Sequence, residues 1–279
     1  MLNDMSRTDL RTPFDTLWHG KDVFAEVFAL EGEEFRNVKN RRTFRIEVNG
    51  KGFFLKIHRG IGWKEIFKNI FQFKLPVTGA GNEYNALEKL HLLGIATMDV
   101  AAFAERNLNP AAKESFLITR ELTGVISLED LVKETELSFV SKKKLIEALG
   151  ESSGKMHRAG INHRDCYICH YLLHKDTLDS SSPRLSVIDL HRAQIRKKVP
   201  FRYQVKDTAG LLFSSFDVPL SKKDIFRFIK AYSGRSLREE LKENSRFYQA
   251  VYRTACKLYL KESGTVPAAD PFAGKTIQR

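Results

Sequence analysis

Two short segments near the N-terminus alternate apolar and polar residues, which is the pattern of β-strands that bury one face. They are RTFRIEV (42–48) and FFLKIH (53–58), and the residues NGKG separate them. Asn-Gly between two strand-like runs is the strongest short signal for a β-hairpin, so we predict a hairpin here. A further pair of strands around Gly32 is predicted within 23–38.

Helical spacing of apolar residues follows this hairpin. In the segment 62–74, the tryptophan, isoleucine and phenylalanine residues recur every three or four positions, which predicts an amphipathic helix. A second helix is predicted at 82–93, because Asn82 can cap its start and Gly94 can end it. SFLITREL (115–122) is a mostly apolar run that is typical of a buried strand.

The second half of the chain is mostly helical in pattern. Ser127 begins the residues SLED, which predict a short capped helix, and Ser141 is a candidate N-cap for a longer helix. Two short strands are predicted at 171–174 and 184–191. Three further helical segments follow, at 206–215, 221–234 and 236–260.

The order of strands, helix, strands and then mostly helices predicts an α+β protein with two lobes. The N-lobe, 1–122, is β-rich with helices near 62–74 and 82–93, and the C-lobe, 123–262, is helical. The tail, 263–279, is rich in small residues, proline and glycine, so we expect it to be mobile. A small-molecule site is expected where the two lobes adjoin.

Basic residues dominate the charge of the chain. Its 279 residues include 46 lysines and arginines against 34 aspartates and glutamates, which gives a net charge of +12. This charge favours nucleic acid, an anionic lipid surface, a phosphorylated substrate or an acidic protein as partner. No nucleic-acid motif is recognised, so specific nucleic-acid binding is not expected. With no signal segment, no membrane-spanning apolar run and three cysteines, a cytoplasmic protein with reduced thiols is expected.

The stretch HRDCYICHYLLH (163–174) has three interpretations. CYICH fits the C-x-x-C-H rule for covalent haem attachment, but that attachment normally takes place outside the cytoplasm. Zinc binding is a minor alternative, since four ligand types occur close together, at Cys166, Cys169, His170 and His174. HRD with a polar residue five positions after the aspartate matches the catalytic loop of kinases.

Phosphoryl transfer needs a lysine on the phosphates, a glutamate to hold it, a carboxylate near the attacking hydroxyl and an acidic metal ligand. The chain offers candidates in that order: Lys56, Glu83, Asp165 and Asp189. Lys56 lies among apolar residues, where a lysine requires an anion, although an exposed edge-strand lysine is the alternative. Glu88 is its fallback partner. Asp189 ends the apolar run LSVID, where a metal or a strand-end turn explains a carboxylate.

Together, HRDCYICHYLLH and SVIDLHRAQ resemble the lipopolysaccharide core heptose(I) kinase family, a branch of the protein-kinase-like superfamily. LKIHRGIGWKEIFKN, KLPVTGAGNEYNAL, KMHRAGINHRD and KDTAGLLFSS add to the resemblance, which runs from about Leu55 to Ser215. The resemblance implies a bilobal protein-kinase-like fold, with a small β-rich N-lobe, a larger helical C-lobe and a catalytic loop at 163–170.

The resemblance also implies an activity, namely transfer of the γ-phosphoryl group of ATP, with Mg²⁺, to a heptose hydroxyl of the lipopolysaccharide inner core. The protein would work peripherally at the cytoplasmic face of the inner membrane, with the core glycolipid and the anionic membrane surface as partners. By the same resemblance, Asp165 is the catalytic base and Asp189 the metal ligand. Lys56 contacts the phosphates, and Glu83 is its pair.

Further residues are assigned by the resemblance, and some depart from the wider kinase pattern. Asp207 resembles the buried helix aspartate that braces the catalytic loop, and His163 and Arg164 would support the loop as well. His170 stands where most kinases have asparagine, and an imidazole is a poor ligand for Mg²⁺, so a second metal is in doubt there. The metal motif is DLH in place of DFG. No G-x-G-x-x-G precedes the lysine, and only Gly32 offers a flexible point.

The sequence gives only weak signals for the residues that bind the acceptor and for those that contact the membrane. Arg192 and Arg196 are the first candidates for acceptor binding, because they follow the metal motif closely. The segment 62–74 either lies on anionic lipid or packs its aromatic residues into its lobe, and packing is favoured. Two other functions stay open, namely a protein kinase and a basic binding module on a kinase-like fold. The oligomeric state is open too.

Overall fold

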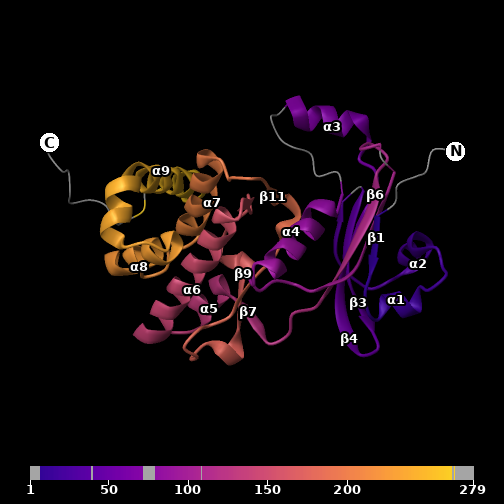
Figure 1. Ribbon diagram of the computed structural model, residues 1–279, viewed down its shortest axis with the longest axis horizontal. Coiled ribbons are helices and arrows are strands. Elements are labelled where there is room, and N and C mark those ends of the chain that lie inside the picture. The colour runs from indigo at the N-terminus through magenta and orange to yellow at the C-terminus, as the bar shows by residue number, and fades with distance from the viewer. Residues whose placement is uncertain (1–6, 39, 72–78, 108, 266, 268–279) are drawn as a thin grey trace. The chain divides into compact units, whose positions relative to one another are not determined.

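The chain divides into two compact units in the computed structural model, which describes residues 7–38, 40–71, 79–107, 109–265 and 267. The sheet unit comprises Met1–Leu92, Met98–Thr123 and Leu190–Arg192. The helical unit comprises Leu93–Thr97, Gly124–Asp189 and Ala193–Arg279. Both units are therefore built from more than one segment of the chain. One unit is built around a β-sheet and the other mainly from helices (Figure 1).

A six-stranded antiparallel sheet forms the centre of the sheet unit (Figure 1). Its strands lie in the order β1 (Arg7–Leu10), β5 (Val100–Arg106), β6 (Glu114–Arg120), β4 (Lys51–His58), β3 (Arg41–Val48) and β2 (Glu33–Val38). The strand β4 pairs on both sides, with β3 and with β6. It is therefore an inner strand, because β6 covers the edge that the hairpin alone would leave unpaired.

The hairpin predicted from the Asn-Gly pair is confirmed. Val48 lies opposite Lys51, so two residues, Asn49 and Gly50, form the turn between β3 and β4. Their φ angles are 53° and 70°, which is the left-handed conformation that Asn-Gly adopts in a two-residue hairpin turn. This turn sets the register of the hairpin and therefore the face on which each β4 side chain lies.

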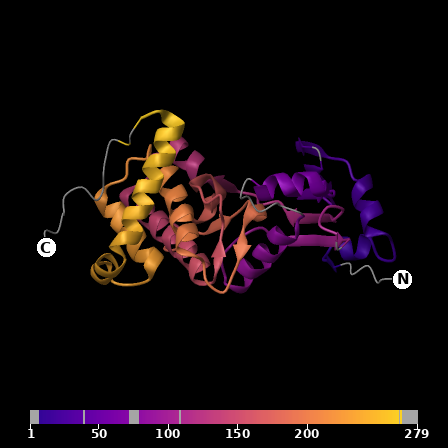
Figure 2. The same ribbon diagram turned by 90° about the horizontal axis from the view of Figure 1, so that it is seen from above.

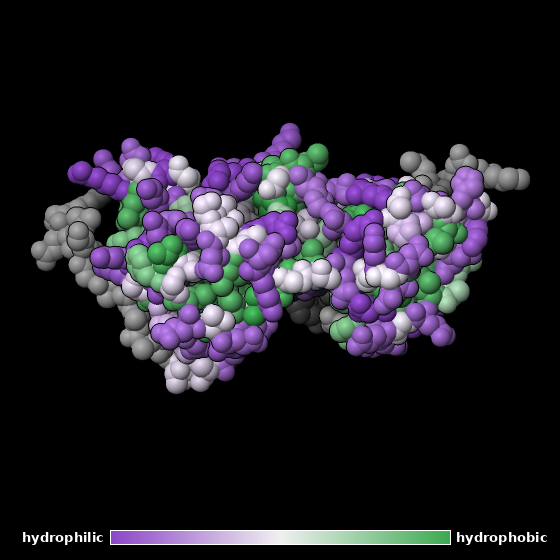
Figure 3. All heavy atoms as spheres, turned by 90° about the horizontal axis from the view of Figure 1, so that it is seen from below, coloured by the Kyte–Doolittle hydropathy of each residue, from purple (hydrophilic) through white to green (hydrophobic). Residues whose placement is uncertain are grey.

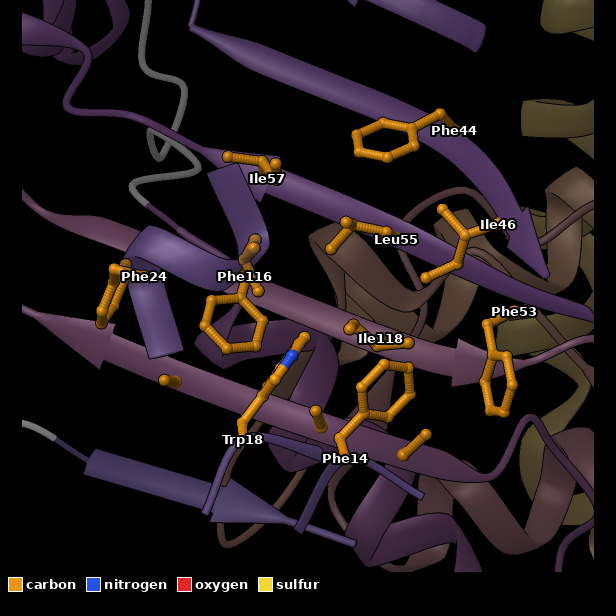
Figure 4. Close-up of a cluster of buried hydrophobic side chains, with 14 residues drawn as sticks. Phe14, Trp18, Phe24, Phe44, Ile46, Phe53, Leu55, Ile57, Phe116 and Ile118 are labelled. Carbon is orange, nitrogen blue, oxygen red and sulfur yellow. The ribbon is translucent and has the colours of Figure 1, made fainter. Parts of the chain in front are cut away.

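One face of the sheet is buried beneath the short helices α1 (Phe14–Leu17) and α2 (Val23–Ala29). Because side chains alternate along a strand, Phe53, Leu55 and Ile57 of β4 all point to this face. Figure 4 shows these three side chains beside the aromatic rings that the two helices and their flanks contribute. Each such side chain stabilises the fold by about 1.5–3 kcal/mol through burial.

The helix α2 corrects a prediction, because a strand was expected in this part of 23–38. The Asp22 side chain accepts hydrogen bonds from the backbone N–H groups of Phe24 and Ala25, so it caps a helix. Phe24 and Val27, three positions apart, are both buried in the core. Only the second half of the predicted pair, Glu33–Val38, is a strand.

The helix α4 (Gly81–Leu92) belongs to the opposite face of the sheet, where the Tyr84 ring stacks on Phe103 of β5 at a centroid distance of 4.1 Å. A further helix, α3 (Gly62–Phe71), lies between β4 and α4 in the chain. Both helices were predicted. Residues 72–74 of the first prediction lie outside the described residues.

The helical unit contains five α-helices within the described residues: α5 (Leu128–Glu134), α6 (Phe139–Arg158), α7 (Phe201–Phe213), α8 (Lys222–Ser233) and α9 (Leu237–Ser263). Figures 1 and 2 show α9 packed beside α7 and α8, where their apolar side chains share one core. Three short strands also pair: β7 (Val125–Ser127), β9 (Tyr171–His174) and β10 (Leu185–Val187). A separate ladder joins β8 (Ile161–Asn162) to β11 (Gln194–Ile195).

Helix ends in this unit follow local chemistry. The helix α5 begins at the predicted cap, Ser127, whose side chain accepts from the N–H of Asp130. The predicted cap Ser141 is wrong, because α6 starts earlier and Ser138 accepts from the N–H of Ser141. Gly154 lies where α6 contacts α8, and a Cβ there would stand 2.0 Å from the Tyr232 carbonyl oxygen. This contact therefore requires glycine.

An apolar cavity of about 130 Å³ lies within the helical unit, among α5 to α9. Leucine, isoleucine and valine side chains dominate its lining, with Leu145, Leu149 and Ile229 among them. The space-filling view from below also shows hydrophobic residues gathered on the surface of this unit (Figure 3).

No helix in the described part of the chain has the length and apolar character that crossing a membrane requires. The predicted tail, 263–279, falls mostly outside the described residues.

Candidate active site

Lys56 of β4 and Glu83 of α4 form a buried ion pair in the sheet unit. Lys56 Nζ lies 2.5 Å from Glu83 Oε1, and the two side chains are 12% and 1% exposed. Since β4 is an inner strand, the alternative of an exposed edge-strand lysine is wrong. The fallback partner Glu88 pairs instead with Arg11, at 2.8 Å. An ion pair so deeply buried fixes the lysine ammonium in one place, as a phosphate-binding lysine requires.

His58 is a neighbour of this pair that the sequence did not single out. It lies two residues after Lys56, so both side chains point to the same face of the sheet, and Arg41 of β3 stands opposite it. Burial, reinforced by the positive charges of Arg41 and Lys56, lowers the pKa of His58 to about 3. His58 therefore stays neutral beside the lysine. The period-2 spacing from Lys56 is the signal that could have revealed it.

We expect the protein to lose stability as the pH falls below about 6.5. Unfolded His58 takes up a proton near pH 6.5, its ordinary pKa, whereas folded His58 does so only near pH 3. Between these values the unfolded state binds more protons, so folding weakens as the pH falls, by about 1.4 kcal/mol at pH 5.5. Thermal unfolding at pH 7.5 and 5.5 measures this. His58→Gln should lose less stability than the natural protein over this interval; an equal loss would contradict the assignment.

In the helical unit, the predicted catalytic loop is held by Asp207 of α7. The carboxylate accepts hydrogen bonds from the backbone N–H groups of His163, at 2.6 Å, and Arg164, at 2.9 Å. His157 Nε2 lies 3.3 Å from the same group, whose side chain is 1% exposed. One buried carboxylate thus satisfies two loop amides that would otherwise lack partners.

The backbone has an unfavourable conformation at one position of the loop, Arg164, and at Asp189, which follows β10. Arg164 has a φ of 75° and Asp189 a φ of 58°, a left-handed region that favours glycine. Such a residue costs about 1–3 kcal/mol and persists only where its surroundings hold it, which is common at active sites. The predicted strand 184–191 accordingly ends at Val187, before Asp189.

His170 lies between the backbone of Asp165 and the carboxylate of Asp189. Its Nδ1 donates to the backbone carbonyl of Asp165 at 2.7 Å, and its Nε2 lies 3.7 Å from the Asp189 carboxylate. The ring also stacks on His163, with centroids 5.5 Å apart and planes 2° from parallel. Buried His163, whose pKa burial lowers, donates from Nε2 to the Ile188 carbonyl at 2.9 Å. The structure therefore brings Asp165, His170 and Asp189 together.

The residues around Asp189 fit Mg²⁺ that is bound together with a nucleotide. Mg²⁺ usually retains several waters and takes one or two protein carboxylates, with substrate phosphates completing its shell. Asp189, partly exposed, offers such a carboxylate. Among the described residues, no group of three or more histidine, cysteine, aspartate or glutamate side chains forms a complete metal site. His170 offers nitrogen, which Mg²⁺ disfavours.

The four side chains of the zinc alternative bond to separate partners. Cys166 Sγ lies 3.6 Å from the Tyr171 hydroxyl, and burial raises the pKa of its thiol well above the usual value. His174 Nε2 contacts Ser186 at 2.8 Å. Burial raises the pKa of Cys169 to about 11, so its thiol stays protonated. Because these side chains contact different neighbours, they do not converge on one point as the four ligands of a zinc site would.

The two arginines predicted to bind the acceptor lie in different units. Arg192 ends the short helix η3 (Leu190–Arg192) and is half-buried. Arg196 Nη1 donates to Asn162 Oδ1 at 2.6 Å, and its guanidinium lies 4.9 Å from the centre of the Tyr203 ring. Arg196 thus has partners within the helical unit.

Comparison with known proteins adds to this geometry. The sequence model of the lipopolysaccharide kinase (Kdo/WaaP) family matches residues 25–232. The lipopolysaccharide core heptose(I) kinase WaaP of Pseudomonas aeruginosa is 48% identical over 257 residues, which cover 91% of this chain and 96% of the relative. The protein of the same name from Escherichia coli K12 is 48% identical over 237 residues, covering 84% and 89%.

A solved structure, of WaaP in complex with acyl carrier protein, has a TM-score of 0.78 and 42% identity, and the match covers 91% of this chain and 99% of that chain. The expected α+β, kinase-like fold is confirmed by this likeness and by the family match. The expected class of enzyme, a phosphotransferase of lipopolysaccharide core synthesis, is confirmed by the relatives. The chain therefore belongs to the lipopolysaccharide kinase (Kdo/WaaP) family.

Proposed function

We propose that this kinase transfers the γ-phosphoryl group of ATP, bound with Mg²⁺, to a heptose hydroxyl of the lipopolysaccharide inner core. The observation that carries the proposal is the loop geometry, in which His170 links Asp165 to Asp189 while Asp207 holds the loop backbone. The heptose acceptor is supported by the names of the relatives. ATP use follows from membership of a kinase family.

Each residue has a role that its surroundings support. The carboxylate of Asp165 accepts the proton of the attacking heptose hydroxyl, which makes the oxygen a better nucleophile. Lys56, held by Glu83, neutralises phosphate charge on the nucleotide. Asp189 would hold Mg²⁺, which supplies charge compensation on the phosphates when bound. Phosphoryl transfer needs positioning and charge from the protein, and these four side chains supply both.

The acceptor explains where the kinase would work. A lipopolysaccharide core is part of a glycolipid, so we place the protein at the cytoplasmic face of the inner membrane. The net charge of +12 supports contact with an anionic membrane surface. Arg192 is the proposed acceptor contact, because it lies three residues after Asp189 in the chain.

The test is a phosphorylation assay with purified protein and ATP. One reaction contains core glycolipid that lacks this phosphate, and a parallel reaction contains a mixture of polypeptides. The proposal predicts Mg²⁺-dependent phosphate incorporation into the glycolipid alone. Incorporation into polypeptides alone would establish the protein-kinase alternative, and no incorporation into either would support the binding-module alternative.

We further propose an acyl carrier protein as the acidic protein partner of this chain. One similar structure is a complex of WaaP with acyl carrier protein. An acyl carrier protein carries fatty acyl chains, and the cavity within the helical unit has an apolar lining that suits such a chain. The positive net charge of the kinase also favours an acidic carrier.

Leu149→Trp is expected to weaken binding of an acylated carrier protein by at least about tenfold, because the indole fills part of the cavity that Leu149 lines. Calorimetric titration with dodecanoyl carrier protein and with the unacylated carrier measures this. Leu260→Trp is the matched control, since Leu260 is exposed on α9 and does not line the cavity. Equal affinity of Leu149→Trp and the natural protein for the acylated carrier would contradict the assignment.

A further inference from the structure

The helix α3 of the sheet unit exposes three large aromatic side chains. Trp63, Phe67 and Phe71 are 50%, 51% and 82% exposed, whereas Ile66 of the same helix is 5% exposed. Packing of this aromatic stripe into the lobe was the favoured prediction, and for these three rings it is wrong. Figure 1 shows α3 at the end of the sheet, beyond the strands of its own unit. The exposed fractions of the three rings show that one side of the helix is uncovered.

The three rings lie on one side of the helix. They are four residues apart, at positions 63, 67 and 71, which places them in a row along its length. The Trp63 and Phe67 rings stack, with centroids 5.8 Å apart. Rings of this size bury about 150–250 Å² each when covered, and a contiguous exposed aromatic surface marks a site of association.

Charges around α3 indicate the chemistry of what it binds. From residue 59 to residue 74 the sequence has four basic residues, Arg59, Lys64, Lys68 and Lys74, and one acidic residue, Glu65, so four minus one gives +3. Of these, Arg59 and Lys64 are exposed in the structure. An aromatic row beside lysines and arginines is the composition of helices that lie in the interface of anionic bilayers.

We propose that α3 is the membrane-contact helix of this kinase, with Trp63, Phe67 and Phe71 inserted among the lipids of an anionic bilayer. Lys64 would reach the lipid phosphates, since lysine keeps its charge near water while its alkyl chain contacts apolar surface. This inference rests on the proposed function, because a glycolipid acceptor requires the kinase to work at a membrane. A bilayer fits better than a protein groove because basic residues outnumber acidic residues four to one in the sequence of this segment, 59–74.

The two tryptophans of the chain make the proposal directly measurable. Trp18 is 5% exposed in the sheet-unit core, whereas Trp63 is half exposed on α3. Vesicles that contain phosphatidylglycerol should therefore shift the emission of Trp63 to shorter wavelength, and brominated phospholipids should quench it. Trp63→Phe should abolish both responses while Trp18 emission is unchanged. Absence of a shift in the natural protein would overturn the proposal.

A second variant separates membrane contact from catalysis. Phe67→Ser combined with Phe71→Ser should lower the vesicle partition coefficient at least about tenfold, because two of the three inserting rings are lost. Phe139→Ser is the matched control, since Phe139 is 63% exposed on α6 and should leave partitioning unchanged. Unaltered partitioning of the double variant, or a fluorescence response to an acidic protein but not to vesicles, would overturn the proposal.

Phosphorylation of a delipidated core oligosaccharide distinguishes this proposal from the proposed function. The double variant should phosphorylate the soluble oligosaccharide at the natural rate and lose activity, at least about tenfold, only on glycolipid embedded in vesicles. A natural protein that binds vesicles but phosphorylates neither acceptor would refute the proposed function and leave the membrane helix supported. An equal loss on both acceptors would overturn the membrane role of α3.

Discussion

Asp165→Asn should lower kcat about 10²–10⁴-fold, with little change in the KM for ATP or in thermal stability. The amide has the shape of the carboxylate but does not accept the proton of the attacking hydroxyl. The backbone carbonyl of Asp165, which His170 contacts, is unaltered by the substitution, so the loop should keep its conformation. Initial rates with core glycolipid and ATP, together with the unfolding temperature, measure the effect.

The control for this variant is Asp176→Asn. Asp176 is an exposed aspartate of the same unit, in the short helix η2 (Lys175–Thr177), so its substitution should leave the rate unchanged. Phosphorylation by Asp165→Asn at the natural rate would show that another group accepts the proton. In that case the role of the catalytic loop would have to be reassigned.

Asp207→Ala should destabilise the protein by about 2–6 kcal/mol and also abolish activity. The substitution leaves the N–H groups of His163 and Arg164 buried without acceptors, at about 1–3 kcal/mol each. It also frees Arg164 from the left-handed conformation that the carboxylate holds. Thermal unfolding measures the loss of stability. Hydrogen–deuterium exchange of the whole protein, read out on the peptide that spans 163–170, measures the loosening of the loop backbone.

The conservative variant makes this prediction specific. Asp207→Asn keeps one carbonyl oxygen as acceptor, so it should lose less stability than Asp207→Ala and show slower exchange in the loop. Equal unfolding temperatures for Asp207→Ala and the natural protein would mean that the two loop amides do not depend on this carboxylate. The bracing role of α7 would then be wrong.

Local signals predicted those parts of the fold that short-range chemistry determines. The hairpin followed from Asn49-Gly50, because a two-residue turn at positive φ requires such residues. The helix predicted at 221–234 ends, as α8, at a glycine that a left-handed C-cap favours, Gly234, whose φ is 68°. Both structures form from residues that are adjacent in the chain, so no tertiary information was needed.

Tertiary packing decided where the predictions were wrong. The segment 23–29 has apolar residues that suit a strand or a helix, and the cap from Asp22 together with burial against the sheet selects the helix. The aromatic row of α3 could equally have been buried, since periodicity identifies a helix without saying what covers it. Ser141 was a plausible cap, but Ser138 begins the helix one turn earlier.

The candidate site was predictable to the extent that motifs identify it. Asp165 belongs to the HRD motif, and Asp189 ends the apolar run LSVID. In the structure, His170 contacts the backbone carbonyl of Asp165 and lies near the carboxylate of Asp189. The pairing of Lys56 with Glu83 followed from their order in kinases, and the structure shows it directly. The neutral state of His58 was not predictable, because it depends on burial and on charges from a neighbouring strand.

Mass spectrometry of core oligosaccharide tests the central claim most directly. Cells that lack this kinase are compared before and after they receive the natural gene or the Asp165→Asn gene. We predict that the natural protein adds one phosphate mass to the heptose region of the core and that the variant does not. An unphosphorylated core in cells that express the natural protein, or a phosphorylated core in cells with the variant, would contradict the account.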